Sequence, residues 1–190
     1  MHLNSQLTLI LGGARSGKSH HAEQLAAGCG PHVLYVATAQ AGDAEMAERI
    51  ENHRRARPAT WRTLEVPTGV GAALQRLDDR PDVILLDCLT LLATNIVLAL
   101  EGRPQADIES AVLAEVDAIV AAQKKLDVPL LVVSNEVGLG LVPPYPVSRV
   151  FRDALGRANQ RLAAAAGRVL LMVAGLPLVV KDVNGRQDEL

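Results

Sequence analysis

A glycine-rich segment near the amino end constrains the fold of this chain more than any other feature. Residues Gly12 to Ser19 read G-G-A-R-S-G-K-S and fit the pattern G-x-x-x-x-G-K-[S/T]. The apolar run Leu7–Leu11 before them is typical of a buried parallel strand, and His20–Ala27 after them favours a helix. A strand, a glycine loop and a helix in this order point backbone N–H groups and a helix N-terminus at phosphates. The segment therefore predicts a P-loop that binds a nucleoside triphosphate.

Two side chains of the loop have predicted roles. Lys18 is expected to reach the β- and γ-phosphates, and the Ser19 hydroxyl is expected to hold Mg²⁺. The alternative is a glycine-rich turn with a chance Lys-Ser pair, and the flanking strand and helix argue against it.

The composition indicates one α/β domain. The 190 residues are 49% hydrophobic but only 2% aromatic, so Leu, Val, Ile and Ala must build the core, which suits strands covered by helices. This length is typical of a single domain, here 1–190, and we expect loose tails at 1–6 and 182–190. A net charge of −2 and few aromatic residues argue against nucleic-acid binding.

Cysteine usage and the lack of long apolar segments indicate a cytoplasmic protein. Cys29 and Cys88 form neither a disulfide framework nor a CxxC metal motif. Nothing at the amino end resembles a signal peptide, and no apolar stretch is long enough to span a bilayer. We therefore expect reduced thiols and no membrane anchor.

Strand-like and helix-like segments alternate along the whole chain. This alternation predicts a mostly parallel sheet with right-handed crossovers and helices on both faces. After the first unit, the expected strands are Val33–Ala37, Trp61–Val66, Asp82–Asp87, Leu130–Ser134, Arg168–Val173 and Leu178–Lys181. The expected helices are Asp43–Arg55, Val70–Leu77, Leu89–Leu100, Gln105–Lys125 and Ser148–Ala166, with a Gly- and Pro-containing loop at Val137–Val147.

Asp87 ends one of these buried strands, at the edge where open α/β sheets bind their ligands. A carboxylate in that place resembles a Walker B acid, which holds Mg²⁺ directly or through water. The alternative is an N-cap of the following helix, because Asp at a strand-to-helix junction commonly caps.

His53 lies in an arginine-rich segment. It follows Met46 and Ile50 at i, i+4 and i+7, so it belongs to the apolar face of its predicted helix. A histidine near a helix C-terminus is usually a favourable dipole partner. Arginines, however, pair with phosphate oxygens and keep an imidazole neutral, so His53 is also a candidate nucleophile toward phosphorus. The arginines around it are Arg49, Arg54, Arg55 and Arg57.

Several blocks together resemble one family. They are the P-loop, Y-V-A-T-A at 35–39, R-I-E-N-H-R-R-A-R-P-A-T-W-R-T-L-E at 49–65, S-N-E-V-G-L-G-L-V-P at 134–143, and F-R-D with G-R-A-N-Q-R-L-A at 151–163. The family is the bifunctional adenosylcobinamide kinase/adenosylcobinamide-phosphate guanylyltransferase of cobalamin biosynthesis. The resemblance runs from about Leu7 to Lys181, and the H-R-R-A-R-P and N-E-V-G-L-G blocks are far more specific than the P-loop.

The resemblance implies two reactions. In the first, the hydroxyl of the aminopropanol arm of adenosylcobinamide is phosphorylated with ATP or GTP. In the second, GMP passes from GTP to adenosylcobinamide phosphate through a GMP-histidine intermediate, giving adenosylcobinamide-GDP and pyrophosphate. It further implies a RecA-like P-loop fold and a homotrimer.

The resemblance also implies the residues of the site. His53 takes the place of the nucleophile, with Lys18 as the second catalytic residue, and Ser19 and Asp87 hold Mg²⁺. Some members carry Glu at the position of Asp87, which changes reach but not role. The implied nucleotide-binding residues are Gly12, Gly13, Ala14, Arg15, Ser16, Gly17, Lys18, Ser19, Ala37, Thr38, Ala39, Arg54, Arg55, Ala56, Arg57, Glu65 and Asp87.

Two other functions compete with this hypothesis. One is a different small-molecule P-loop kinase without a covalent intermediate, and the other is a non-catalytic nucleotide switch. Neither explains the H-R-R-A-R-P and N-E-V-G-L-G blocks. The corrinoid pocket is not located by the sequence, although Asn135-Glu136 follow a strand and could border it.

Overall fold

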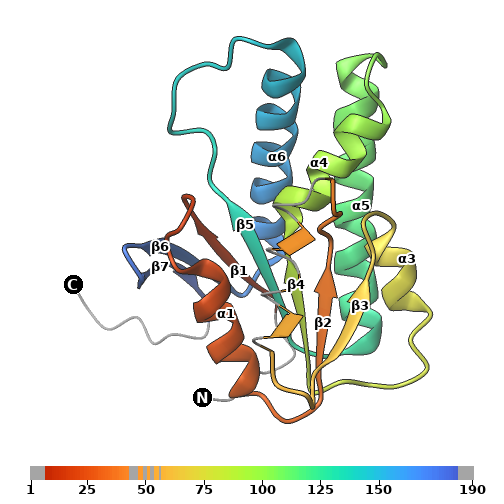
Figure 1. The fold of residues 1–190 in the computed structure, drawn as a ribbon, viewed down its shortest axis with the longest axis vertical. Coiled ribbons are helices and arrows are strands. Elements are labelled where there is room, and N and C mark those ends of the chain that lie inside the picture. The colour runs from red at the N-terminus through yellow and green to blue at the C-terminus, as the bar shows by residue number, and fades with distance from the viewer. Residues whose placement is uncertain (1–6, 43–46, 49–50, 52–53, 56, 184–190) are drawn as a thin grey trace.

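The computed structural model describes residues 7–42, 47–48, 51, 54–55 and 57–183. The described strands form one sheet in the order β3-β2-β4-β5-β1-β6-β7 (Figure 1). Neighbouring strands run parallel, except that β7 is antiparallel to β6. The strands are β1 (Leu7–Gly12), β2 (Val33–Ala37), β3 (Arg62–Glu65), β4 (Val83–Asp87), β5 (Leu130–Asn135), β6 (Arg168–Val173) and β7 (Leu176–Asp182).

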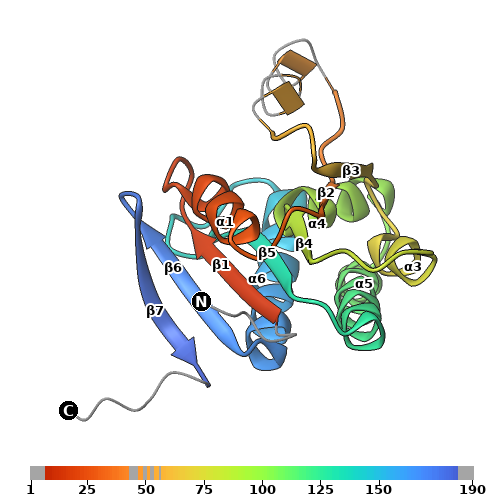
Figure 2. The ribbon, with the colours of Figure 1, turned by 90° about the horizontal axis from the view of Figure 1, so that it is seen from below.

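Helices cover the two faces of this sheet unequally. The helix α1 packs on one face, where Ala22 and Ala26 meet alternate strand residues such as Ile10 and Leu85. Of the helices whose bounds lie in the described part of the chain, the other four pack on the opposite face around a larger apolar cluster (Figure 2). Because side chains alternate along a strand, each buried strand supplies both clusters. The helices are α1 (Lys18–Ala27), α3 (Val70–Gln75), α4 (Leu89–Ala99), α5 (Gln105–Leu126) and α6 (Pro146–Ala165).

The boundaries agree with the sequence expectations to within a few residues. Two strands, Val33–Ala37 and Arg168–Val173, have the predicted bounds. The last strand is longer than predicted and includes Asp182, so the prediction that Asp182 belongs to a loose tail is wrong. Residues 1–6 and 184–190 lie outside the described part of the chain. Within that part, no helix is long and apolar enough to cross a membrane.

The predicted helix Asp43–Arg55 falls mostly on residues that are not described. Those of its residues that the structure describes, 47–48, 51 and 54–55, are helical. His53 and Ala56 lie outside the described residues, so their placement stays a prediction.

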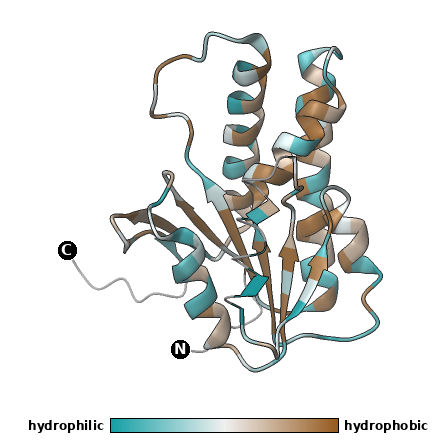
Figure 3. Ribbon diagram, viewed as in Figure 1, coloured by the Kyte–Doolittle hydropathy of each residue, from teal (hydrophilic) through white to brown (hydrophobic). Residues whose placement is uncertain are grey.

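The sheet brings the predicted site residues to one edge. Strand β5 lies between β1 and β4, so it separates the strand that enters the P-loop from the strand that ends at Asp87. The carboxyl ends of these parallel strands share an edge, which is where doubly wound sheets bind ligands. The centre of the sheet is apolar, and so is the hairpin of β6 and β7 (Figure 3).

Candidate nucleotide-binding site

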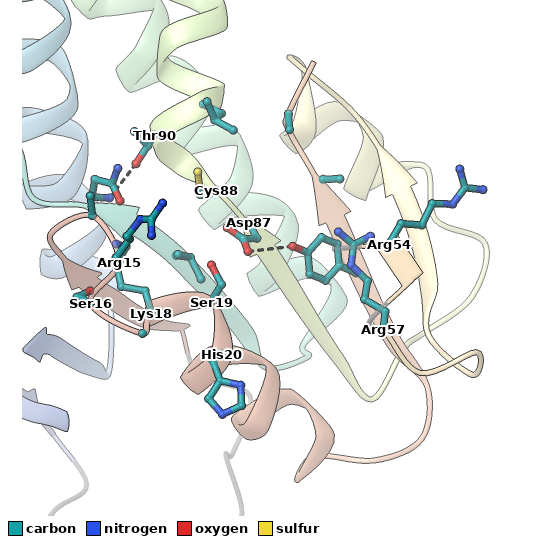
Figure 4. Close-up of a pocket in the computed structure, with 18 of the residues that line it drawn as sticks. Arg15, Ser16, Lys18, Ser19, His20, Arg54, Arg57, Asp87, Cys88 and Thr90 are labelled. Carbon is teal, nitrogen blue, oxygen red and sulfur yellow. Dashed lines mark hydrogen bonds between the residues drawn. The ribbon is translucent and has the colours of Figure 1, made fainter. Parts of the chain in front are cut away.

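A cavity of about 920 Å³ opens at the carboxyl edge of the sheet. One side is formed by the P-loop, which we call the phosphate wall (Gly12–Ser19). The opposite side, the arginine wall, consists of Arg54, Arg57 and Glu65. Asp87 lies between the two walls (Figure 4). The lining residues are Ala14, Arg15, Ser16, Gly17, Lys18, Ser19, His20, Tyr35, Ala37, Ala39, Ala41, Arg54, Arg57, Glu65, Asp87, Cys88, Thr90, Leu91, Val133 and Asn135.

The backbone of the phosphate wall has the conformation that a P-loop needs. Arg15 and Gly17 both have left-handed backbone angles, with φ of 56° and 92°. Such residues curl a loop so that successive N–H groups face a common point, which creates an anion-binding concavity. Gly12 packs so closely that an added Cβ would lie 2.6 Å from Ser16 Oγ and 2.7 Å from the Met172 carbonyl oxygen. The Gly175 N–H of the β6–β7 turn donates to the Ser16 carbonyl oxygen at 3.0 Å and braces the loop from outside.

Lys18 is the buried cation of the phosphate wall. Its side chain is largely buried, and Nζ donates to the Gly13 carbonyl oxygen at 2.6 Å. Burial lowers the pKa of Lys18 below its ordinary value, and the nearby Cys88 and Asp87 oppose that shift. The ammonium group is thus held at the loop, where a phosphate oxygen can replace the carbonyl as its partner.

Ser19 and Asp87 both line the cavity and fit the predicted metal site. A hydroxyl and a carboxylate are hard oxygen donors, and Mg²⁺ in nucleotide sites takes one or two protein oxygens together with phosphate oxygens. The Asp87 Oδ2 atom accepts a hydrogen bond from the Tyr35 hydroxyl at 2.9 Å. Helix α4 begins after Cys88 and has no side-chain N-cap bond, so Asp87 does not cap it.

Tyr35 connects Asp87 to the arginine wall. The Arg57 guanidinium carbon lies 3.5 Å from the centroid of the Tyr35 ring, a cation–π contact. Arg57 Nη1 also donates to Thr63 Oγ1 at 3.3 Å. Burial, followed by the charge of Asp87, raises the pKa of the Tyr35 hydroxyl far above its ordinary value, so this hydroxyl is the donor to the carboxylate.

The predicted nucleotide-binding residues divide into those that reach the cavity and those that do not. Arg55 is not among the lining residues, and its Nε instead donates to Glu51 Oε1 at 2.8 Å on the exposed side of the segment. Gly12, Gly13 and Thr38 are also not among the lining residues. Thr38 is fully buried, where its hydroxyl donates to the Cys88 carbonyl oxygen at 2.7 Å and accepts from the Cys88 N–H at 2.9 Å. It therefore links the end of β2 to the end of β4.

Several lining residues were not predicted from the sequence. They are His20, Tyr35, Ala41, Cys88, Thr90, Leu91 and Val133. Asn135 also lines the cavity, whereas the sequence suggests it only as a border of the corrinoid pocket. Asn135 is fixed through its backbone, whose N–H donates to Thr90 Oγ1 at 2.8 Å and whose carbonyl oxygen accepts from Asn159 Nδ2 at 3.1 Å. Alternation along β2 was the available signal for Tyr35, since its side chain must face the same way as that of Ala37.

A glycine loop between a central strand and a helix, a buried lysine and a facing carboxylate define the class: a P-loop nucleotide-binding α/β protein. Two solved structures share this fold, and the likeness confirms the predicted RecA-like architecture. Flagellar accessory protein FlaH from Methanocaldococcus jannaschii has a TM-score of 0.50 and 16% identity, covering 94% of this chain and 79% of that chain. The RadB recombinase has the same TM-score of 0.50 and identity of 16%, covering 88% of this chain and 74% of that chain.

Within this class, the chain belongs to the cobinamide kinase/cobinamide phosphate guanyltransferase family, whose model matches residues 8–180. The bifunctional adenosylcobalamin biosynthesis protein CobU of Salmonella typhimurium is 44% identical over 181 residues, covering 92% of this chain and 99% of that relative. The protein of the same name from Escherichia coli K12 is 42% identical over the same coverage. The bifunctional adenosylcobalamin biosynthesis protein CobP of Pseudomonas aeruginosa is 46% identical over 173 residues, covering 91% and 96%. The family resemblance seen in the sequence is thereby confirmed.

Proposed function

We propose that this cavity carries out both reactions of the family, phosphorylation of cobinamide and guanylyl transfer to cobinamide phosphate. The observation that supports this most directly is that one cavity combines a P-loop with an arginine wall. A kinase needs the P-loop, because phosphoryl transfer depends mainly on positioning and charge neutralisation. Attack on an α-phosphate uses the arginine wall, because guanidinium groups bind phosphate oxygens in a forked geometry.

In the kinase reaction, the acceptor is the hydroxyl of the aminopropanol arm of adenosylcobinamide, and the donor is ATP or GTP. The hydroxyl oxygen forms a bond to the γ-phosphorus and gives up its proton to solvent, while the bond from the γ-phosphorus to the bridging oxygen breaks and the nucleoside diphosphate leaves. Lys18 and the loop N–H groups hold the triphosphate in line for this displacement. Ser19 and Asp87 would hold Mg²⁺, which would neutralise charge on the phosphate oxygens.

In the guanylyl transfer, His53 is the proposed nucleophile. An imidazole nitrogen bonds to the α-phosphorus of GTP and pyrophosphate leaves, which gives a GMP-histidine. A phosphate oxygen of adenosylcobinamide phosphate then displaces the histidine and forms adenosylcobinamide-GDP. His53 itself lies outside the described residues. Support comes from its place in H-R-R-A-R-P, whose Arg54 and Arg57 line the cavity.

Labelling with GTP that carries ³²P at the α-phosphate tests the histidine mechanism. The wild-type protein with Mg²⁺ should acquire a label that is lost in acid and stable in base, as a phosphoramidate is. Adding adenosylcobinamide phosphate should chase the label into product. His53→Asn should abolish labelling, whereas His32→Asn, at an exposed position just before β2, should not. A wild-type protein that never becomes labelled would remove the covalent mechanism and favour a kinase without an intermediate.

We further propose a cytoplasmic homotrimer, which rests on the family resemblance. One described surface that fits contact with another copy of the chain is β7, an edge strand with exposed Leu176, Leu178, Val179 and Val180. An exposed apolar edge strand is a liability unless another chain covers it. Light scattering after gel filtration should give three times the chain mass for the wild-type protein. The double variant Leu178→Asp, Val180→Asp should have a lower mass. An unchanged mass in that double variant would exclude β7 from the contact.

A further inference from the structure

Tyr35 is a buried side chain that the proposed chemistry does not yet use. Its exposed fraction is only 2%, although its ring reaches the cavity. It makes two polar contacts in different directions. The hydroxyl donates to Asp87 Oδ2 at 2.9 Å, the dashed contact at Asp87 in Figure 4, and the ring face lies 3.5 Å from the Arg57 guanidinium carbon. The residue therefore lies between the acidic group of the site and an arginine of the arginine wall.

Sheet register explains why one side chain reaches both groups. Tyr35 is opposite Leu85 in β4, and Ala37 is opposite Asp87. Side chains alternate along both strands, so Tyr35 and Asp87 project from the same face at diagonal positions, within reach of an aromatic side chain. On its other side Tyr35 is opposite Thr63 in β3, the residue whose hydroxyl also accepts from Arg57. Both contacts of Arg57 thus come from one pair of opposed residues.

We propose that Tyr35 is a positioning residue that orients the Asp87 carboxylate for Mg²⁺ and holds the Arg57 guanidinium against the nucleotide. The inference rests on the proposed role of Asp87 in holding Mg²⁺. A carboxylate with one oxygen engaged by a fixed donor cannot rotate freely, so its other oxygen is presented toward the cavity. A guanidinium stacked on a buried ring likewise loses side-chain freedom before the nucleotide arrives, which lowers the entropic cost of binding.

The competing explanation is that Tyr35 is only a core residue whose hydroxyl needs a partner, as buried tyrosines usually do. The two explanations differ in what the hydroxyl does for Mg²⁺. A core role predicts that removing the hydroxyl changes stability alone, or weakens nucleotide binding equally with and without Mg²⁺. A positioning role predicts that the loss is confined to the Mg²⁺-dependent part of binding.

A fluorescent GTP analogue measures this directly, because its affinity can be determined in EDTA and as a function of Mg²⁺ concentration. Tyr35→Phe removes the hydroxyl and keeps the ring. It should raise the Mg²⁺ concentration that gives a half-maximal effect by about ten- to a hundredfold, the value of a hydrogen bond to a charged group, while the affinity in EDTA should change less than about twofold. Tyr35→Leu also removes the ring and should weaken binding in EDTA about fivefold, the value of a cation–π contact. The matched control is Tyr145→Phe, at the only other tyrosine, which is exposed.

Asp87→Asn separates a failure of this inference from a failure of the proposed function. If it raises the Mg²⁺ requirement while Tyr35→Phe behaves as wild type, the role of Tyr35 is overturned and the role of Asp87 stands. If Asp87→Asn leaves the Mg²⁺ requirement unchanged, the metal assignment falls and the inference with it. If Tyr35→Phe lowers the affinity for the GTP analogue equally in EDTA and in Mg²⁺, the positioning role of Tyr35 is also overturned. Circular dichroism checks the fold of each variant, and the test of the hydroxyl with Tyr35→Phe stands by itself if Tyr35→Leu does not fold.

Discussion

The phosphate wall and the arginine wall face the same cavity but are held in different ways. The phosphate wall follows β1, a buried strand between β5 and β6, and it presents mainly backbone groups. The arginine wall adjoins β3, an edge strand with three of its four residues exposed. Its position relies on side-chain contacts such as those of Arg57 with Tyr35 and Thr63. The sheet therefore fixes the position of the phosphate wall, whereas a few side-chain contacts fix the position of the arginine wall.

This difference has a consequence for what each wall can tolerate. A P-loop must present N–H groups at fixed points, so rigidity is an advantage, and close packing around Gly12 supplies it. Two different phosphates must be attacked in the two proposed reactions, at the γ and at the α position. A wall made of arginine side chains can adjust to both, because long side chains change rotamer more easily than a buried strand moves.

The largest effect should come from the one charged side chain of the phosphate wall that is buried. Lys18→Ala removes the cation that both reactions are proposed to share, and kcat/KM of each should fall by about 10²–10³, the value of one preorganised donor. Separate assays of phosphorylation and of guanylyl transfer measure it. Lys124→Ala, at an exposed position in the last turn of α5, is the control. Loss of only one reaction would show that the phosphate wall does not serve both.

A glycine pair tests whether the phosphate wall is held by packing. Gly12→Ala places a Cβ against Ser16 Oγ and the Met172 carbonyl oxygen, and should lower the free energy of unfolding by about 1–3 kcal/mol. Gly13→Ala meets nothing within 4 Å and should change it by less than about 0.5 kcal/mol. Urea denaturation without nucleotide measures both. Equal stability of the two variants would mean that the loop moves to accommodate the added Cβ. The phosphate wall would then not be held more rigidly than the arginine wall.

The two walls also differ in how far the sequence could predict them. The P-loop, its flanking elements and the place of Asp87 follow from local pattern, because spacing and strand periodicity encode them directly. The partner of Asp87 does not, since it depends on the register of β2 against β4, which brings together residues that are 52 apart in the chain. Thr90 and Asn135 reach the cavity through strand order in the same way. Among neighbouring arginines, local pattern does not specify which one turns inward.

That choice between arginines gives the smallest and most specific test of the comparison. Arg57 lines the cavity, whereas Arg55 forms an exposed ion pair with Glu51, and such pairs contribute little. Arg57→Leu should weaken binding of GTP about five- to tenfold by removing one phosphate contact and its stacked support, while Arg55→Leu should change it less than about twofold. Arg57→Lys keeps the charge but cannot stack as a planar group, so it should fall between the two. Equal effects of Arg55→Leu and Arg57→Leu would mean that the wall acts through its overall charge, and that its side-chain contacts do not select one arginine for the nucleotide.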